Sequence, residues 1–127
     1  MQNTKPGNYV DGFLLTVPKE KLAEYKKMAK WGAKTWMKHG ALDYKECMID
    51  DATPKEVAFP FGKAIKAKPD EIVFFSYIVF ESKAHRVAVN KKVMSDPEML
   101  AFSEKNSKMP FDMKRFAYGG FKVVVSA

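Results

Sequence analysis

Two patterns of apolar residues follow one another in the first third of the chain. The segment NYVDGFLLTV, residues 8–17, is rich in strand-forming residues and predicts a β-strand. From Pro18 the apolar residues recur at spacings of three and four, which predicts an amphipathic helix of about 20 residues. His39 and Gly40 are expected to end this helix. Its apolar stripe contains Leu22, Tyr25, Ala29, Gly32 and Trp36.

The middle of the chain contains two further predicted strands separated by a long connection. ALDYKECMID, residues 41–50, predicts the second strand, and EIVFFSYIVF, residues 71–80, predicts the third. In residues 71–80 both sets of alternating positions are largely apolar, so both faces of this strand must be buried. One layer of helices can cover only one face, and a second layer or a partner must cover the other. Residues 51–69 contain three prolines with Phe59 and Phe61, and we expect them to form an ordered cover rather than a free linker.

The last third predicts two helical segments and a final strand. Ser82 is expected to cap a helix that ends near Ser95, and Asp96 to cap a second helical segment over residues 96–105. Residues 115–126 predict the last strand, in which Gly119 and Gly120 indicate a bulge or a close approach of the backbone.

The resulting order of β, α, β, β, α and β predicts an α+β fold of the ferredoxin-like type. In this fold an antiparallel sheet carries two main helices on one face and leaves the other face bare. Because the bare face is predicted to be apolar, we expect a homodimer in which a second subunit covers it.

Composition supports a single domain over residues 1–127, because the length and the apolar fraction are those of one globular unit. The sequence has neither a recognisable export signal nor an apolar run long enough to span a membrane. The lone Cys47 cannot form an internal disulfide. We therefore expect a cytoplasmic protein without membrane association.

A net charge of +7 raises the question of an anionic partner. Lys26, Lys30, Lys34 and Lys38 follow at intervals of four, so they share one face of the first helix. A solvated helix face is the simpler explanation of this spacing, and an RNA-binding or acidic-partner surface is the alternative.

Four stretches of the sequence resemble a known family. They are GNYVDGF, HGALDYKEC, KPDEIVFFSYIVFESKAHRVAVNKKVMSDP and MPFDMKRFAYGGFKV, and together they span nearly the whole chain. They are similar to the YbaA-like family of small bacterial proteins, a domain of unknown function. The resemblance implies a dimeric α/β barrel, in which two sheets face each other across a two-fold axis. It implies no particular reaction.

His85 and Arg86 are the residues nearest to a catalytic pair in sequence. With Ser82 as the cap, His85 takes the third helical position and shares a stripe with Val89. We expect a packed, hydrogen-bonded histidine, and a general base is the alternative. Arg86 lies about 100° further round the helix, and we expect it to pair with an acid such as Glu81 or Asp112, although a role in ligand binding also stays open.

The remaining candidates lie within the predicted strands. An acid on an apolar strand face must be paired or have a raised pKa, which makes Asp11 and Glu46 candidate catalytic residues. An ion pair between strands or between subunits is the favoured alternative for both acids. Tyr77 is a further catalytic candidate, and three polar residues are candidates for contacting a ligand: Tyr44, Ser76 and Tyr118.

The histidines and the cysteine lack zinc-ligand spacing, and the sequence shows neither a phosphate-binding glycine loop nor a nucleophile elbow. We therefore expect no metal and no nucleotide cofactor. The sequence favours a protein that binds a small ligand inside the barrel. A cofactor-independent monooxygenase of the antibiotic-biosynthesis type and an RNA-binding or acidic-partner-binding protein are the alternatives.

Overall fold

The computed structural model describes residues 7–105 and 108–127. The predicted single domain also includes residues 1–6 and 106–107, which lie outside the described residues. The elements follow in this order: β1 (Tyr9–Pro18), the 3₁₀ helix η1 (Lys19–Lys21), α1 (Leu22–Lys38), β2 (Asp43–Met48), α2 (Phe61–Ala64), β3 (Glu71–Phe80), α3 (Lys83–Met94), α4 (Pro97–Lys105), the 3₁₀ helix η2 (Met113–Arg115) and β4 (Ala117–Lys122).

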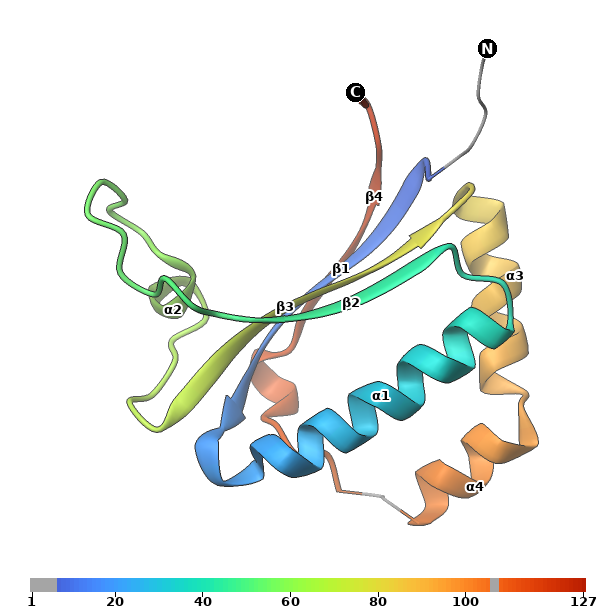
Figure 1. Cartoon of the computed structure of the whole chain (residues 1–127), viewed down its shortest axis with the longest axis horizontal. Coiled ribbons are helices and arrows are strands. Elements are labelled where there is room, and N and C mark those ends of the chain that lie inside the picture. Colours follow the sequence, from blue (N-terminus) through green and yellow to red (C-terminus); the bar gives the residue numbers. More distant parts are fainter. Residues whose placement is uncertain (1–6, 106–107) are drawn as a thin grey trace.

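The described strands form one sheet in the order β2-β3-β1-β4, and every neighbouring pair is antiparallel. Helices α1, α3 and α4 lie together on one side of this sheet, whereas α2 lies beyond its far end (Figure 1). The predicted α+β class and the antiparallel sheet are confirmed. The strand order is consistent with the ferredoxin-like arrangement, with α2 and α4 as additions to it.

The two faces of the sheet differ in burial although both are largely apolar. On β3, side chains facing the helices are almost fully buried, including Phe74, Ile78 and Phe80. On the opposite face, Phe75 is 45% exposed, and Phe121 of β4 is 60% exposed. Helices α1, α3 and α4 therefore cover one face only, and a surface of apolar side chains remains on the other, with the short helix α2 contacting it at Phe75. We call this surface the helix-free face.

Helix α1 begins later than the sequence pattern predicts. Pro18 has an extended backbone, with φ −56° and ψ 137°, and ends the ladder opposite Glu71 instead of opening the helix. Lys19 then donates its backbone N–H to Asp70, which holds the turn in a 3₁₀ form before Leu22. The predicted end is confirmed, because Gly40 has φ +110°, a conformation that glycine adopts without strain.

The last strand is shorter than predicted and contains no bulge. Arg115 belongs to η2, which Asp112 caps by accepting the backbone N–H of Lys114 at 2.9 Å, so β4 starts only at Ala117. The register between β1 and β4 runs without interruption past Gly119 and Gly120. The glycines instead leave room for aromatic rings, because a Cβ on Gly120 would overlap the Tyr9 hydroxyl.

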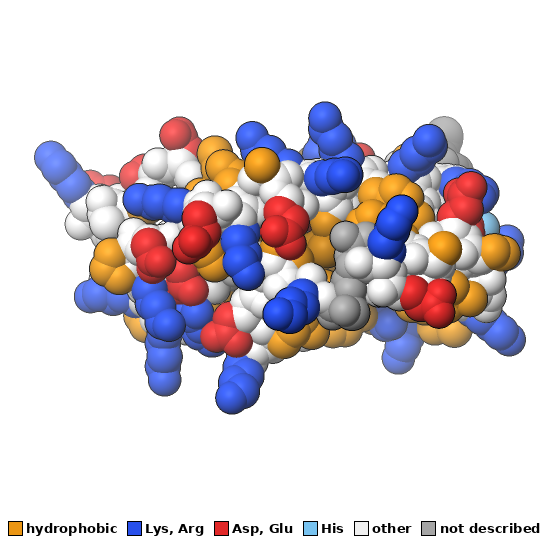
Figure 2. All heavy atoms as spheres, turned by 90° about the horizontal axis from the view of Figure 1, so that it is seen from below, with side chains coloured by type: hydrophobic (Ala, Val, Ile, Leu, Met, Phe, Trp, Pro, Cys, Tyr) orange, Lys and Arg blue, Asp and Glu red, His pale blue; other side chains and the backbone are white. Residues whose placement is uncertain are grey.

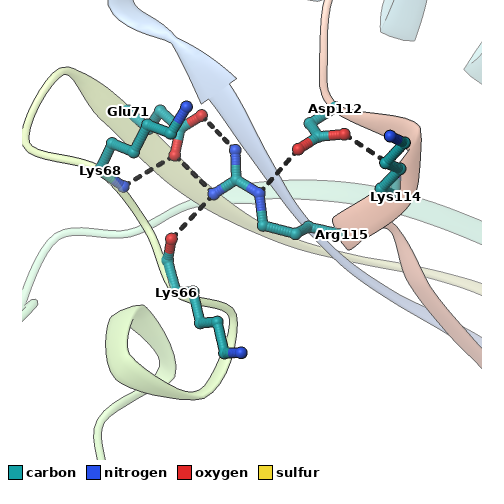
Figure 3. Close-up of polar contacts among 6 residues, drawn as sticks. All are labelled: Lys66, Lys68, Glu71, Asp112, Lys114 and Arg115. Atoms are coloured by element: carbon teal, nitrogen blue, oxygen red, sulfur yellow. Dashed lines mark hydrogen bonds and ion pairs between the residues drawn. The ribbon is translucent and has the colours of Figure 1, made fainter.

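Several contacts hold the connection between β2 and β3 against the rest of the fold. Ile65 is buried, and the ring of Phe61 stacks on that of Phe75 on the helix-free face, with centroids 6.3 Å apart. Figure 3 shows Arg115 reaching Glu71 with two nitrogens, at 2.7 and 2.6 Å, and the backbone oxygen of Lys66 at 2.9 Å. The Arg115 guanidinium also lowers the pKa of the Glu71 carboxyl below its ordinary value.

Candidate functional site

A cavity of about 370 Å³ lies between the helix-facing side of the sheet and helices α1 and α4. Its wall is largely apolar, and much of it is aromatic. The sheet contributes Phe13 and Ile78, α1 contributes Trp31 and Trp36, and α4 contributes Met99 and Phe102. A cavity of this size and composition is typical of a site for a small, largely apolar molecule.

The carboxylate of Glu46 lies on the sheet side of this cavity and accepts three hydrogen bonds from hydroxyl groups. Tyr25 donates to Oε1 at 2.6 Å, and Ser76 donates to the same oxygen at 2.5 Å. Tyr44 donates to Oε2 at 2.8 Å. Each of these four residues contributes to the cavity lining. We call them the Glu46 cluster.

The Glu46 cluster is electrostatically unusual because the described residues that bind its acid are all neutral. Among the described residues, no lysine or arginine forms an ion pair with Glu46. The cluster also changes its tyrosines: burial and the nearby Glu46 charge raise the pKa of Tyr25 and of Tyr44 well above the ordinary value. Both phenols therefore stay protonated at neutral pH and act as donors to the carboxylate.

Local structure explains how these residues meet. Tyr44 and Glu46 are two apart on β2, so they face the same side, and Glu46 is directly opposite Ser76 of β3. Tyr25 reaches them from the buried stripe of α1. On the same helix, a Cβ at Gly32 would lie 3.1 Å from the Tyr44 hydroxyl, so glycine at this position gives that hydroxyl its room.

The structure brings three of the predicted candidates together, Glu46, Tyr44 and Ser76. Tyr25 was missed as a site residue, because a tyrosine in the apolar stripe of a helix has the pattern of a core residue. Tyr77 is next to Ser76 on β3, and alternation directs its side chain to the helix-free face, although it contributes atoms to the cavity wall.

Asp11 belongs to a second polar cluster, between β1, β4 and α3. Its Oδ1 accepts the Tyr118 hydroxyl at 3.0 Å and lies 3.6 Å from Nε of Arg86. Arg86 also donates to the Tyr9 hydroxyl at 3.1 Å. Burial raises the pKa of the Asp11 carboxyl, while the Tyr118 hydrogen bond and the Arg86 charge act in the opposite direction.

This cluster corrects one prediction from the sequence. Arg86 pairs with neither Glu81 nor Asp112: its acid is Asp11, and Asp112 binds Arg115 at 2.8 Å. The helical pattern around Arg86 does not show which acid lies next to it, and the antiparallel sheet brings Asp11 of β1 beneath α3. Asp11 is thus ion-paired, as favoured, but with a helix residue rather than across strands.

Trp36 connects the two clusters. Its indole N–H donates to the side-chain oxygen of Asn90 at 2.9 Å, and Asn90 also hydrogen-bonds Asp11. The Trp36 ring lies 6.3 Å from that of Tyr44. One wall of the cavity is therefore continuous with the buried Asp11–Arg86 pair.

His85 lies away from the Glu46 cluster, at the start of α3. The predicted cap is present, since the backbone N–H of His85 donates to Ser82 Oγ at 3.1 Å. Its ring nitrogen Nδ1 accepts the backbone N–H of Glu81 at 2.9 Å, and its ring packs edge-on against Phe80. These contacts are those of a packed, hydrogen-bonded side chain.

The other histidine and its acid hold two helices together. His39 Nε2 lies 2.6 Å from Asp96 Oδ2, at the junction between the end of α1 and the start of α4. The His39 ring, the backbone N–H of Glu98 and Lys38 hold the pKa of Asp96 well below its ordinary value. Asp96 caps α4, as predicted, through its hydrogen bond from Glu98 at 2.8 Å.

Within residues 7–105 and 108–127, no group of three or more histidine, cysteine or acidic side chains is placed to hold a metal ion. No helix among these residues is both long and apolar enough to cross a membrane. On the side of the molecule that carries the helices, lysines and arginines are interspersed with acids and apolar side chains rather than gathered into one basic surface (Figure 2).

Residues 8–113 match the family described as a protein of unknown function, DUF1428. The chain belongs to this family. Two relatives named uncharacterized protein YbaA, from Escherichia coli strain K12 and from Shigella flexneri, are each 44% identical to this chain over 117 residues. The alignment covers 92% of this chain and 97% of each relative. The resemblance to the YbaA-like family is confirmed.

The DUF1428 match includes every residue of the Glu46 cluster and most of the second cluster. Tyr118, which donates to Asp11, lies beyond its end. The family description and the names of the relatives give no ligand or reaction, so the function must be argued from the geometry of the site.

Proposed function

We propose that this DUF1428 protein binds a small, largely apolar molecule in the cavity between its sheet and its helices, without a metal or nucleotide cofactor. The observation that carries the proposal is the Glu46 cluster, four polar residues at one place in a wall that is otherwise largely apolar. A few converging polar groups in an apolar cavity are the usual mark of a ligand site.

The packing around the cavity supports this proposal. A domain core normally fills its interior to high density, because an empty volume loses dispersion contacts on all sides. Here α1 carries a glycine at position 32, and the aromatic rings of Trp31 and Phe102 stack on each other 4.3 Å apart. Both features belong to the wall of a space of about 370 Å³ that residues 7–105 and 108–127 leave unfilled.

The experiment measures binding of a neutral apolar probe, N-phenyl-1-naphthylamine, by isothermal titration calorimetry. Wild-type protein should bind the probe, and Met99→Trp should weaken binding at least about tenfold because the larger ring occupies the cavity. Met37→Trp is the matched control, since Met37 is exposed on α1 and is not part of the cavity wall. Absence of binding to the wild type, or equal binding by both variants, would contradict the proposal.

We also propose that the protein acts in the cytoplasm as a ferredoxin-like homodimer, with two helix-free faces packed together as a dimeric α/β barrel. The exposed rings of Phe75 and Phe121 support this arrangement, because a soluble monomer seldom leaves a sheet face of this kind uncovered. In such a dimer the ligand cavity stays within each subunit, on the other side of the sheet.

A further inference from the structure

We propose that the natural ligand of the cavity is an organic cation, an aromatic or aliphatic molecule with one protonated amine that binds Glu46. This inference rests on the proposed function and narrows its ligand class. Three observations lead to it: the unpaired charge of Glu46, its remaining acceptor position and the aromatic wall.

The first observation concerns charge. A carboxylate that is partly removed from water is normally paired with a cation, because hydrogen bonds alone do not neutralise its charge. Three other acids whose side chains are buried have such partners: Asp11 has Arg86, Glu71 has Arg115, and Asp96 has Lys38. Among the described residues Glu46 receives only hydroxyl groups.

The basic residue next to Glu46 in sequence is directed elsewhere. Lys45 precedes Glu46 on β2, so its side chain points to the opposite face of the sheet, where its ammonium group binds Asp43 at 2.5 Å. The charge of Glu46 is therefore available to a molecule that enters the cavity.

The second observation concerns geometry. A carboxylate offers about four acceptor positions, two on each oxygen. Oε1 already accepts from Tyr25 and Ser76, whereas Oε2 accepts from Tyr44 alone among the described residues. One position on Oε2 is left for a donor from a ligand, and the three hydroxyl groups hold the carboxylate in place to receive it.

The third observation concerns the rest of the wall. Aromatic faces attract cations through the negative charge of their π-systems, and they attract apolar groups through burial. The cavity wall includes Trp31, Trp36, Phe111 and Phe116. A carboxylate with surrounding aromatic rings recognises a molecule that is positively charged at one end and apolar over the rest. It disfavours an anion of the same shape.

The test uses three probes with the same ring system: 2-(naphthalen-2-yl)ethylamine, 2-(naphthalen-2-yl)ethanol and 2-naphthylacetic acid. Wild-type protein should bind the amine at least about tenfold more tightly than the alcohol at pH 7, and should bind the acid least. Calorimetry gives all three affinities directly. If alcohol and amine bind equally, the cation proposal is wrong while the cavity remains a ligand site; if none binds, both proposals are wrong.

Two variants separate charge from shape. Glu46→Gln removes the charge but keeps the size of the side chain, so the preference for the amine should disappear while the alcohol still binds. Tyr44→Phe removes one hydroxyl and keeps the charge, so the preference should persist. Melting curves establish that each variant is folded. A folded Glu46→Gln protein that retains the full preference for the amine would overturn the inference. A wild-type protein without that preference would also overturn it, and this second result does not depend on whether the variants fold.

Discussion

Single residues at the Glu46 cluster show how far sequence patterns can identify a site. Alternation on the second strand placed Tyr44 and Glu46 on one face, and this was sufficient to nominate both. The role of Tyr25 depends on the angle at which α1 crosses the sheet, which no local pattern contains. Arg86 is a similar case, because its partner Asp11 is 75 positions away in sequence, and only the completed fold brings the two together.

The contacts of His85 predict a modest loss of stability when its side chain is removed. His85→Ala removes the acceptor for the Glu81 N–H and the edge-on contact with Phe80. We expect a loss of unfolding free energy of about 1 kcal/mol, the lower part of the 1 to 3 kcal/mol range for such losses, because the hydrogen bond lies near the surface. Urea denaturation measures this loss, with Lys92→Ala as an exposed control on the same helix.

Ligand binding provides the second readout for His85. A structural His85 leaves probe affinity unchanged in the folded variant, because the residue is not part of the cavity wall. A variant with unaltered stability that no longer binds the probe would show that His85 acts on the ligand after all.

Among the helices and strands, periodic sequence patterns predicted the boundaries of regular elements well. They predicted wrong boundaries where the backbone conformation of a single residue sets the end of an element. Strand β3 and helix α3 begin and end within a residue or two of their predicted limits. Pro18 was assigned to a helix because proline suits a first helical turn, but its extended backbone continues the ladder of β1. The prolines and phenylalanines of the β2–β3 connection predicted order but not its conformation, since distant contacts through Arg115 and Phe75 fix its position.

Arg115 should control the order of that connection. Arg115→Ala removes both bonds to Glu71 and the bond to the Lys66 backbone (Figure 3). Amide hydrogen exchange over residues 61–70 should then become at least about tenfold faster, because opening this segment no longer breaks those contacts.

Lys114→Ala is the matched control for this experiment, because Lys114 is the exposed neighbour of Arg115 in η2. Unchanged exchange in Arg115→Ala would show that Ile65 and Phe61 hold the segment without the guanidinium. Exchange as fast as in an unfolded peptide throughout residues 51–69 of the wild type would contradict the prediction that this segment is an ordered cover.

At the scale of the whole molecule, the helix-free face determines the expected assembly. An obligate dimer interface typically buries about 2,000 Å² or more and is rich in apolar side chains. Sedimentation velocity at micromolar concentration should show a dimer. Phe121→Asp should shift it towards monomer, because a charge would be buried at the interface.

Val87→Asp is the control for the dimer, since Val87 is similarly exposed but lies on α3, on the helix side of the molecule. A wild type that sediments as a uniform monomer would rule out the homodimer. The sequence predicted the bare face from the two apolar faces of residues 71–80. It did not predict that a cavity lies on the other side, between the sheet and the helices, because the position of a cavity is a property of packing.

The position of the aromatic residues in α1 has a practical consequence. The chain contains two tryptophans, and both Trp31 and Trp36 are part of the cavity wall. One indole stacks on Phe102 of α4, and the other is hydrogen-bonded to Asn90 of α3. Because indole emission responds to local polarity and quenching, the tryptophan fluorescence of the protein originates entirely beside the cavity. A non-fluorescent compound can therefore be screened against the unlabelled protein, and the native chain itself serves as the sensor.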